Sequence, residues 1–266
     1  MGIVQGLTEF LPISSSGHLI IIPNLLGWTD PFIESLAFSV MLHMGTLVAL
    51  LVYFWRDWAA LIPAGLAAIR DRSIGGDPDR RVAVSLVIAT IPASIVGVLF
   101  GDYIEANVRQ VGLVALMLLV GAAILWLADR WGAKMLRMED LGLVRALGVG
   151  AAQAIALVPG ISRSGISISA GLFAGLEREA AARFSFLMAT PVIAGAGLFE
   201  ARKLLGGDTA AADHLGPLIV GLVASLISGF LAIHLLLRYV RSNSMGVFVV
   251  YRIGLAAVVT VSLLAR

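Results

Sequence analysis

Three ionisable residues, Glu9, His18 and Arg163, lie in segments that are otherwise strongly apolar. An unpaired charge is costly in such surroundings, so we expect each of them to face a polar cavity or a partner. A carboxylate can serve as a base or a metal ligand, an imidazole as an acid, base or nucleophile, and a guanidinium can bind phosphate through two parallel hydrogen bonds. Together these residue types indicate phosphoryl chemistry.

The residues around these groups strengthen that interpretation. Gln5 precedes Glu9 by four positions, so the two share one face of a helix. Two serine-glycine turns, Ser14–Gly17 and Ser162–Gly165, each supply hydroxyl groups and can begin a helix. The free amides at a helix N-terminus bind anions, and if both turns converge they would form a pocket for a strongly anionic group.

The segments that carry these residues are apolar but broken. Residues 1–24 contain Pro12 and Pro23, and residues 147–175 contain Pro159 followed by Gly160. Proline and glycine interrupt the backbone hydrogen bonds of a helix. Such an interruption is tolerated at membrane depth only where the backbone is buried in protein or lines a water-filled cavity. We therefore predict two re-entrant segments, each a short helix, a polar turn and a second short helix.

The rest of the chain has the composition of a membrane protein. Of its 266 residues, 59% are hydrophobic and 14% are charged, against about 45–50% and about 25% in soluble domains. A net charge of +2 gives no sign of nucleic-acid binding, and the absence of cysteine excludes disulfides and thiolate metal sites. Apolar stretches long enough to span a bilayer occupy residues 36–55, 82–100, 111–128, 184–205, 217–238 and 246–264.

Basic residues predict the orientation of these spans. Thirteen of the nineteen lie in one set of loops and four in the opposite set, which places the first set in the cytoplasm. Arg163 and Arg252 lie inside apolar segments instead. We expect Arg252 and its neighbour Tyr251 to reach the cytoplasmic interface from the end of the last span. His43, inside the first span, is expected to be a packed or cavity-lining histidine.

The two broken segments resemble each other at a constant offset of 148 residues. Paired in this way are Gln5 with Gln153, Ile13 with Ile161, Ser14 with Ser162, Ser16 with Ser164, Gly17 with Gly165 and Ile20 with Ile168. One broken segment followed by three spans makes an odd number of crossings, so two such halves have opposite orientations. We predict a single all-α integral membrane domain over residues 1–266, with six transmembrane helices and two re-entrant segments in an inverted repeat of residues 1–130 and 140–266.

Both broken segments carry recognisable motifs. Residues Gln5–His18, QGLTEFLPISSSGH, resemble the first signature of the undecaprenyl-pyrophosphate phosphatase family of the bacitracin-resistance type. Residues Pro159–Gly165, PGISRSG, resemble its second signature. The resemblance covers essentially the whole chain, although the first helix looks shorter at its N-terminus than in the family.

The resemblance implies removal of one phosphate from undecaprenyl pyrophosphate, a C55 lipid, with a divalent cation (Mg²⁺ or Ca²⁺). It implies a multi-pass protein of the bacterial plasma (inner) membrane, among membrane lipids, with a site open to the periplasmic or extracellular face; a homodimer is compatible with it. By position, the expected catalytic residues are Glu9, Ser15, His18 and Arg163, with Glu9 as the metal ligand. The expected substrate-binding residues are Gln5, Ser14, Ser162, Arg163, Ser164 and Ser167.

Several alternatives remain open at this stage. The nucleophile is Ser15, for which His18 three residues away on the same turn is the candidate base, His18 attacking directly, or a water molecule positioned by Glu9. A transporter or lipid-phosphate flippase could use the same anion pocket, but would not need Glu9, Ser15 and His18. The phosphatidic-acid-phosphatase type of membrane enzyme is rejected, because its Lys-x6-Arg-Pro element is absent from the sequence.

Overall fold

The computed structural model describes residues 1–204 and 214–265, apart from a few side chains, and this part of the chain is helical without a regular strand. Five helices are long and apolar enough to cross a membrane: α6 (Pro78–Val108), α7 (Val111–Trp131), α10 (Arg178–Leu204), α12 (Leu215–Val240) and α13 (Gly246–Leu264). A sixth candidate is a pair of helices, α4 (Leu36–Tyr53) and α5 (Trp55–Asp71). The prediction of an all-α membrane protein is therefore confirmed.

The sixth candidate differs in shape from the straight span that the sequence predicts. Helix α4 covers most of the predicted span 36–55, but α5 continues directly from it at an angle of 81°. Charged side chains mark both ends of α5, where Arg56 follows Trp55 and Arg70 precedes Asp71. An amphipathic helix that packs against α6 thus lies in the interval between the predicted spans 36–55 and 82–100.

The two broken segments form short helices separated by turns, as predicted. The first comprises α1 (Gly2–Phe10) and α2 (Ser15–Leu26), and the second α8 (Leu143–Ile155) and α9 (Arg163–Phe173). At 1.5 Å per residue each helix is shorter than about 20 Å, so none of them alone crosses a hydrocarbon core of about 30 Å. The remaining described elements are one short helix, α3 (Pro31–Glu34), and a 3₁₀ turn, Met138–Asp140.

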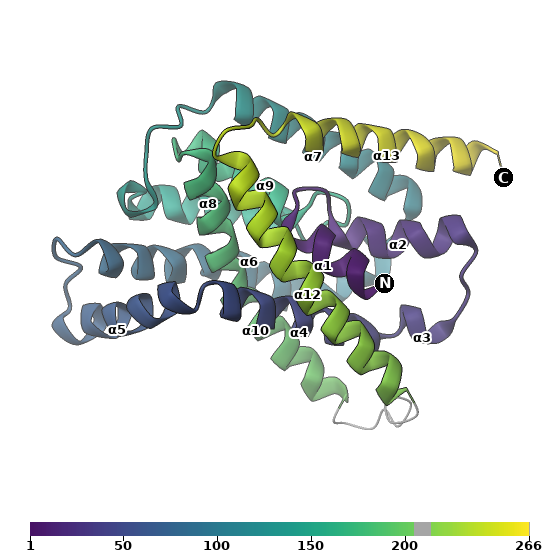
Figure 1. The fold of residues 1–266 in the computed structure, drawn as a ribbon, viewed down its shortest axis with the longest axis horizontal. Helices are drawn as coiled ribbons and strands as arrows, with labels where there is room; N and C mark the ends of the chain where they lie inside the picture. Colours follow the sequence, from purple (N-terminus) through teal and green to yellow (C-terminus); the bar gives the residue numbers. More distant parts are fainter. Residues whose placement is uncertain (205–213, 266) are drawn as a thin grey trace.

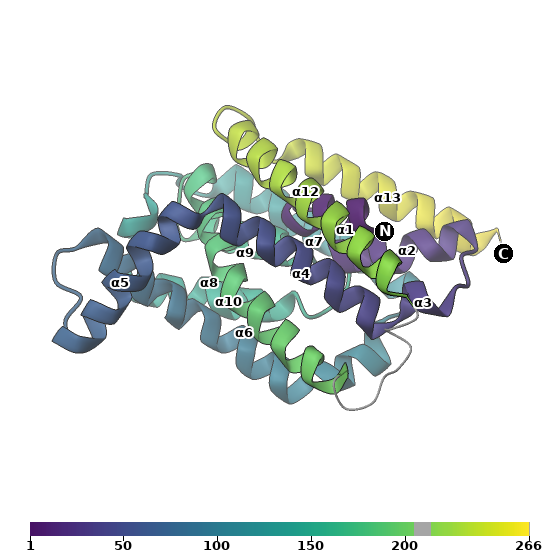
Figure 2. The same ribbon diagram turned by 60° about the horizontal axis from the view of Figure 1, so that its bottom comes forward.

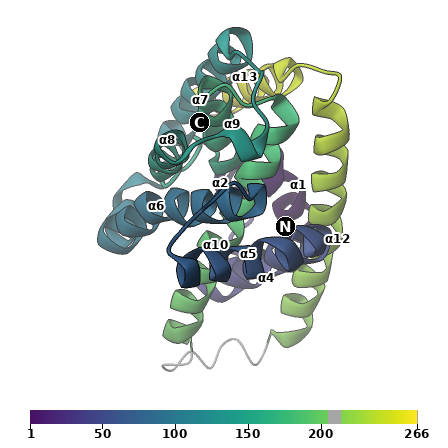
Figure 3. The same ribbon diagram turned by 90° about the vertical axis from the view of Figure 1, so that its left-hand side faces the viewer.

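Helices α1 and α9, which flank the two turns, lie in the middle of the molecule. Helices α7 and α13 pack side by side along one edge (Figure 1), and α4 packs along α12 (Figure 2). Viewed from one end, α6 and α8 lie on one side and α12 on the other, with α1 and α9 between them (Figure 3). The long helices thus surround the elements that carry the predicted site.

Glycines allow α1 and α8 to approach their long partners closely. A Cβ at Gly2 would lie 2.6 Å from the Gly221 carbonyl oxygen of α12, and one at Gly150 would collide with the Ala89 carbonyl oxygen of α6. Gly2 and Gly150 are 148 residues apart, the same offset as in the sequence repeat. The first helix of each broken segment, α1 or α8, therefore crosses a long helix closely at an equivalent glycine.

Candidate active site

The carboxylate of Glu9 lies at the centre of the candidate site. It is buried near the C-terminal end of α1, and its Oε2 atom accepts hydrogen bonds from Ser15 Oγ at 2.5 Å and from Gln5 Nε2 at 3.0 Å. The other oxygen, Oε1, accepts a hydrogen bond from Arg163 Nη2 at 2.7 Å. The structure therefore brings together four predicted residues that come from both halves of the chain.

A strained backbone presents Ser15 and Arg163 to this carboxylate. Ser14 and Ser162, the residues before them, have φ angles of 76° and 75°, a region that L residues other than glycine rarely adopt. Such a conformation costs about 1–3 kcal/mol per residue and persists only where the surrounding structure imposes it. Ser15 and Arg163 are in consequence the first residues of α2 and α9.

The predicted serines at these turns hold the backbone in place. Ser14 Oγ accepts the Gly17 amide at 3.3 Å, and Ser162 Oγ accepts the Gly165 amide at 3.1 Å, so both serines are N-caps, as expected from the sequence. These hydroxyls are buried in protein contacts. Direct substrate binding by Ser14 and Ser162 remains a prediction.

Two further predicted serines of the second segment are also occupied by protein partners. Ser164 Oγ donates to the Leu11 carbonyl oxygen at 3.0 Å, which ties the second turn to the first. Ser167 Oγ lies 2.6 Å from both the Arg163 carbonyl oxygen and Ser185 Oγ. Both residues support the turn that carries Arg163, and their contact with a substrate also remains a prediction.

His18 has partners at both ring nitrogens. Nδ1 donates to the Ser14 carbonyl oxygen at 2.7 Å, because a carbonyl can only accept. In the neutral ring, Nε2 then accepts from the Tyr251 hydroxyl, also at 2.7 Å. The structure thus joins His18 to the backbone of the first turn and to α13, a geometry that favours a positioning role. Ser15 Oγ donates to Glu9 and not to His18, and a part for His18 in catalysis stays a prediction.

His43 lies beside the carboxylate of Glu9, a proximity that the sequence did not predict. Its Nε2 atom is 3.9 Å from Glu9 Oε2, beyond hydrogen-bond reach, and Nδ1 donates to the Ser39 carbonyl oxygen at 2.8 Å. The side chain is 35% exposed and lines a cavity of about 200 Å³ together with Ser16 and Ser39. The expectation of a cavity-lining histidine is therefore confirmed, but the sequence carried no signal that this cavity adjoins Glu9.

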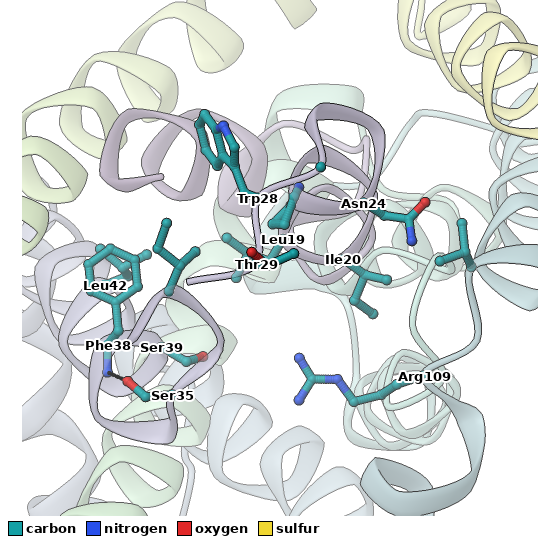
Figure 4. A pocket seen from close by; sticks show the side chains of 14 residues that line it. Leu19, Ile20, Asn24, Trp28, Thr29, Ser35, Phe38, Ser39, Leu42 and Arg109 are labelled. Carbon is teal, nitrogen blue, oxygen red and sulfur yellow. Dashed lines mark hydrogen bonds between the residues drawn. The ribbon is translucent and has the colours of Figure 1, made fainter. Parts of the chain in front are cut away.

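A larger hollow of about 590 Å³ continues from this cavity, and both are lined by Leu19, Ile20, Ser39 and Arg109. Figure 4 shows the Arg109 guanidinium directed into it, opposite the side chains of Ser35, the N-cap of α4, and Ser39 of α4. Trp28 and Phe38 add an aromatic lining. An amphipathic ligand could therefore reach the vicinity of His43 with a polar group inward and apolar surface along the wall.

The expectation for Arg252 is wrong, because its side chain is fully buried instead of reaching the interface. The guanidinium donates to five backbone carbonyl oxygens at 2.9–3.3 Å, those of Pro12, Met117, Leu118, Gly160 and Ile161. Backbone carbonyl oxygens thus accept the hydrogen bonds of the buried guanidinium. Tyr251 remains 45% exposed, but its hydroxyl is engaged by His18.

The residues present suit a divalent cation that is shared with a substrate better than a dedicated metal cage. Within the described part of the chain, no group of three carboxylate, histidine or cysteine side chains converges. Glu9 offers one carboxylate, and Gln5 Oε1 is a buried oxygen without a hydrogen-bond partner. Mg²⁺ in particular is commonly held by one or two carboxylates, waters and substrate phosphates. Glu9 and Gln5 are thus the candidate ligands.

The arrangement has the parts that phosphoryl transfer requires. Ser15 is a hydroxyl hydrogen-bonded to a carboxylate base, and Arg163 is a 17% exposed guanidinium beside it. Phosphoryl transfer depends mainly on positioning and on stabilising negative charge.

Comparison with known proteins identifies the family of the chain. The model of the family described as bacitracin resistance protein BacA matches residues 1–258. An undecaprenyl-diphosphatase of Desulforudis audaxviator is 44% identical over 266 residues, which cover 100% of this chain and 97% of the relative. Another of Moorella thermoacetica is 45% identical over 259 residues, covering 97% and 94%. A third, of Thermomicrobium roseum, is 45% identical over 266 residues, covering 97% and 94%.

Proposed function

This chain belongs to the bacitracin resistance protein BacA family, and on that premise we propose that it is an undecaprenyl-diphosphatase. It hydrolyses undecaprenyl pyrophosphate to the monophosphate and inorganic phosphate, which recycles the lipid carrier for cell-wall synthesis and confers bacitracin resistance. The observation that carries the proposal is the contact of Glu9 with both Ser15 and Arg163, because it unites a base, a hydroxyl and a phosphate-binding group.

In the reaction that we propose, Arg163 binds the pyrophosphate and compensates its charge. Ser15 Oγ attacks the terminal phosphorus while its proton passes to Glu9 Oε2, with which it already shares a 2.5 Å hydrogen bond. The bridging P–O bond breaks and its electron pair leaves with the lipid monophosphate. Glu9 releases the proton that it took from Ser15 to the departing monophosphate or to solvent. Water then attacks the phosphoserine while Glu9 takes one of its protons, the P–Oγ bond breaks, and Glu9 returns that proton to Ser15 Oγ as inorganic phosphate leaves.

The contacts of the site favour Ser15 among the three nucleophiles considered. Both ring nitrogens of His18 are engaged, so His18 would have to break a hydrogen bond before it attacked. Direct attack by water, with Glu9 as the base and Ser15 as a hydrogen-bond donor, predicts no covalent intermediate. Trapping of radioactive phosphate on Ser15 would distinguish the two routes.

We also propose a divalent cation, Mg²⁺ or Ca²⁺, as a cofactor held by Glu9, by Gln5 and by the substrate. When bound, it would neutralise the negative charge of the pyrophosphate oxygens. The buried, unpartnered Gln5 Oε1 atom supports this assignment, since amide oxygens are suitable ligands for hard cations. As the neutral counterpart of a carboxylate, Gln5 does not act as a base.

We place the chain in the bacterial inner membrane, with the site open to the periplasmic face. The excess of basic residues in one set of loops supports this orientation. Three of those arginines form ion pairs with carboxylates of other segments, which supports a location of these loops at the same polar end of the molecule. The pairs are Arg183 with Asp57, Arg178 with Asp129 and Arg241 with Glu179. Membrane lipids and a homodimeric partner are proposed as well, and light scattering of the purified protein in detergent measures the oligomeric state.

The test is phosphate release from undecaprenyl pyrophosphate by the purified full chain in detergent, with and without EDTA. The wild type is expected to release one phosphate per lipid and to lose activity when EDTA removes the cation. Arg163→Ala is expected to remain folded and to lose most of its activity. Full activity of Arg163→Ala would contradict the site, and a wild type that moves the lipid without hydrolysis would favour a transporter.

A further inference from the structure

Arg252 is the largest fully buried side chain in the described part of the protein. It lies in α13, and the neighbouring helix α7 makes room for it, because a Cβ at Gly121 would collide with Arg252 Nη2. Among the described residues, no carboxylate is paired with it, and all of its hydrogen bonds go to backbone carbonyl oxygens. A buried cation without an anionic partner is costly, so its position calls for a functional explanation.

The carbonyl groups that it binds belong to both catalytic turns. Nη1 donates to the Pro12 carbonyl oxygen at 3.3 Å, and Nη2 donates to the Gly160 carbonyl oxygen at 2.9 Å. Pro12 and Gly160 are 148 residues apart, so one guanidinium joins equivalent positions of the two broken segments. Each acceptor lies two residues before a strained serine, Ser14 or Ser162.

We propose that Arg252 is the positioning residue that aligns Ser15 with Arg163, an inference that rests on the proposed function. The two catalytic side chains follow the strained serines directly and meet at Glu9. A shift of either turn moves one of them relative to the bound phosphate. The planar guanidinium presents five N–H donors in a fixed geometry and can therefore fix the separation of two backbone segments.

The neighbouring residue supports the same assignment. The Tyr251 hydroxyl binds His18 Nε2, and His18 Nδ1 binds the carbonyl oxygen of Ser14 itself. The rings of His18 and Tyr251 are stacked with centroids 5.7 Å apart. Tyr251 thus contacts the first turn through His18, and Arg252 contacts it directly. Of these two residues, only Arg252 also contacts the second turn.

The kinetic test compares Arg252→Gln and Arg252→Lys with the wild type. Lysine keeps the positive charge and a long stem but lacks the planar fork, so it cannot join the turns in the same way. We expect kcat per folded enzyme to fall about 100-fold in both variants with KM little changed, because a misplacement of about 1 Å has an effect of this size. Should Arg252→Gln fail to fold, Arg252→Lys carries the test. The matched control, Arg178→Lys, alters an arginine that contacts neither turn and should keep the wild-type kcat.

A second measurement does not depend on activity. The chain contains no cysteine, so spin labels can be attached at Leu26→Cys and Phe173→Cys, two exposed positions at the far ends of α2 and α9. Pulsed electron resonance should give a narrow distance distribution in the wild-type background and a broader or shifted one with Arg252→Lys. A wild-type kcat in Arg252→Lys, or an unchanged distance distribution, would overturn the proposal. A wild type without phosphatase activity would refute the proposed function, while the distance measurement would still test Arg252.

Discussion

Replacement of Glu9 by glutamine is the most informative single change, because it removes a charge while keeping the shape of the side chain. Three hydrogen bonds converge on this carboxylate, from Gln5, Ser15 and Arg163. A bond to a charged group contributes about 1.5–3 kcal/mol and a neutral one about 0.5–1.5 kcal/mol, so each bond loses about 1 kcal/mol. The expected loss in the free energy of unfolding is therefore about 3 kcal/mol.

The surroundings can adapt to the new amide group. Ser15 Oγ can accept a hydrogen bond in place of donating one, and Gln5 can turn its amide so that the unpartnered Oε1 atom accepts instead. Arg163, which is 17% exposed, can still donate to the amide oxygen of the new side chain. We therefore expect Glu9→Gln to fold and to elute as the wild type does in size-exclusion chromatography.

Catalysis should suffer far more than stability. General-base catalysis contributes about 10²–10⁴-fold, and the amide cannot take a proton from Ser15. We expect kcat to fall about 10³-fold, equivalent to about 4 kcal/mol in activation free energy. The assay is phosphate release from undecaprenyl pyrophosphate in detergent, with the folded fraction measured on the same sample.

A matched control is Glu179→Gln, which removes a carboxylate that pairs with Arg241 on the surface. That variant should keep the wild-type kcat, because exposed ion pairs contribute little and this one lies outside the site. A kcat within tenfold of the wild type for folded Glu9→Gln would refute the assignment of Glu9 as the base.

Three further predictions test other parts of the site. Ser15→Ala should lower kcat at least 100-fold and abolish the trapped phosphoenzyme, whereas trapping on another residue would exclude Ser15 as the nucleophile. His43→Gln should keep kcat within about tenfold, because its Nε2 atom lies 3.9 Å from Glu9 and is too far away to take a proton directly; a 10³-fold loss would make His43 catalytic. Gly6→Ala should destabilise the protein by about 1–3 kcal/mol or more, because its Cβ would collide with Ser228 Oγ and the Ser225 carbonyl oxygen of α12. An unchanged melting temperature would contradict this close packing of α1 against α12.

The sequence was sufficient to predict the parts that depend on local pattern. Hydropathy located the long helices, and proline and glycine located both breaks, because these signals act over a few residues. The caps at Ser14 and Ser162 follow from the same local chemistry. The meeting of Glu9 with Arg163 was also predictable, since intramembrane charges require partners and the repeat brings two turns together.

The contacts of Arg252, His18 and His43 were beyond the reach of such reasoning. Arg252 binds backbone carbonyl groups, which every residue carries, so its partners leave no trace in side-chain identity. His18 resembles a catalytic residue because it ends the serine turn, but its ring nitrogens face Ser14 and Tyr251. Only the packing of α13 and α4 against the broken segments decides these contacts.

The two turns show how one scaffold can supply two different catalytic groups. The offset of 148 residues pairs Ser14 with Ser162, and these serines have nearly the same φ angle. The same offset pairs Ser15 with Arg163, so the proposed nucleophile and the phosphate-binding guanidinium occupy equivalent first positions of α2 and α9. The first half alone carries the carboxylate, since Leu157 stands opposite Glu9 in the repeat.

We infer that the halves kept the strained turn and divided the chemistry between them. A turn with φ near +75° precedes both Ser15 and Arg163, and both side chains contact Glu9, so this geometry serves a hydroxyl as well as a guanidinium. Duplication alone would have produced two hydroxyls or two cations at the centre, and two adjacent guanidinium groups would repel each other. Divergence at the single position after each cap gives an attacking group and an anion-binding group on opposite sides of one carboxylate. Exchange of the two residues, Ser15→Arg with Arg163→Ser, should therefore keep the fold but lose phosphatase activity, because the carboxylate of Glu9 remains in the first half only.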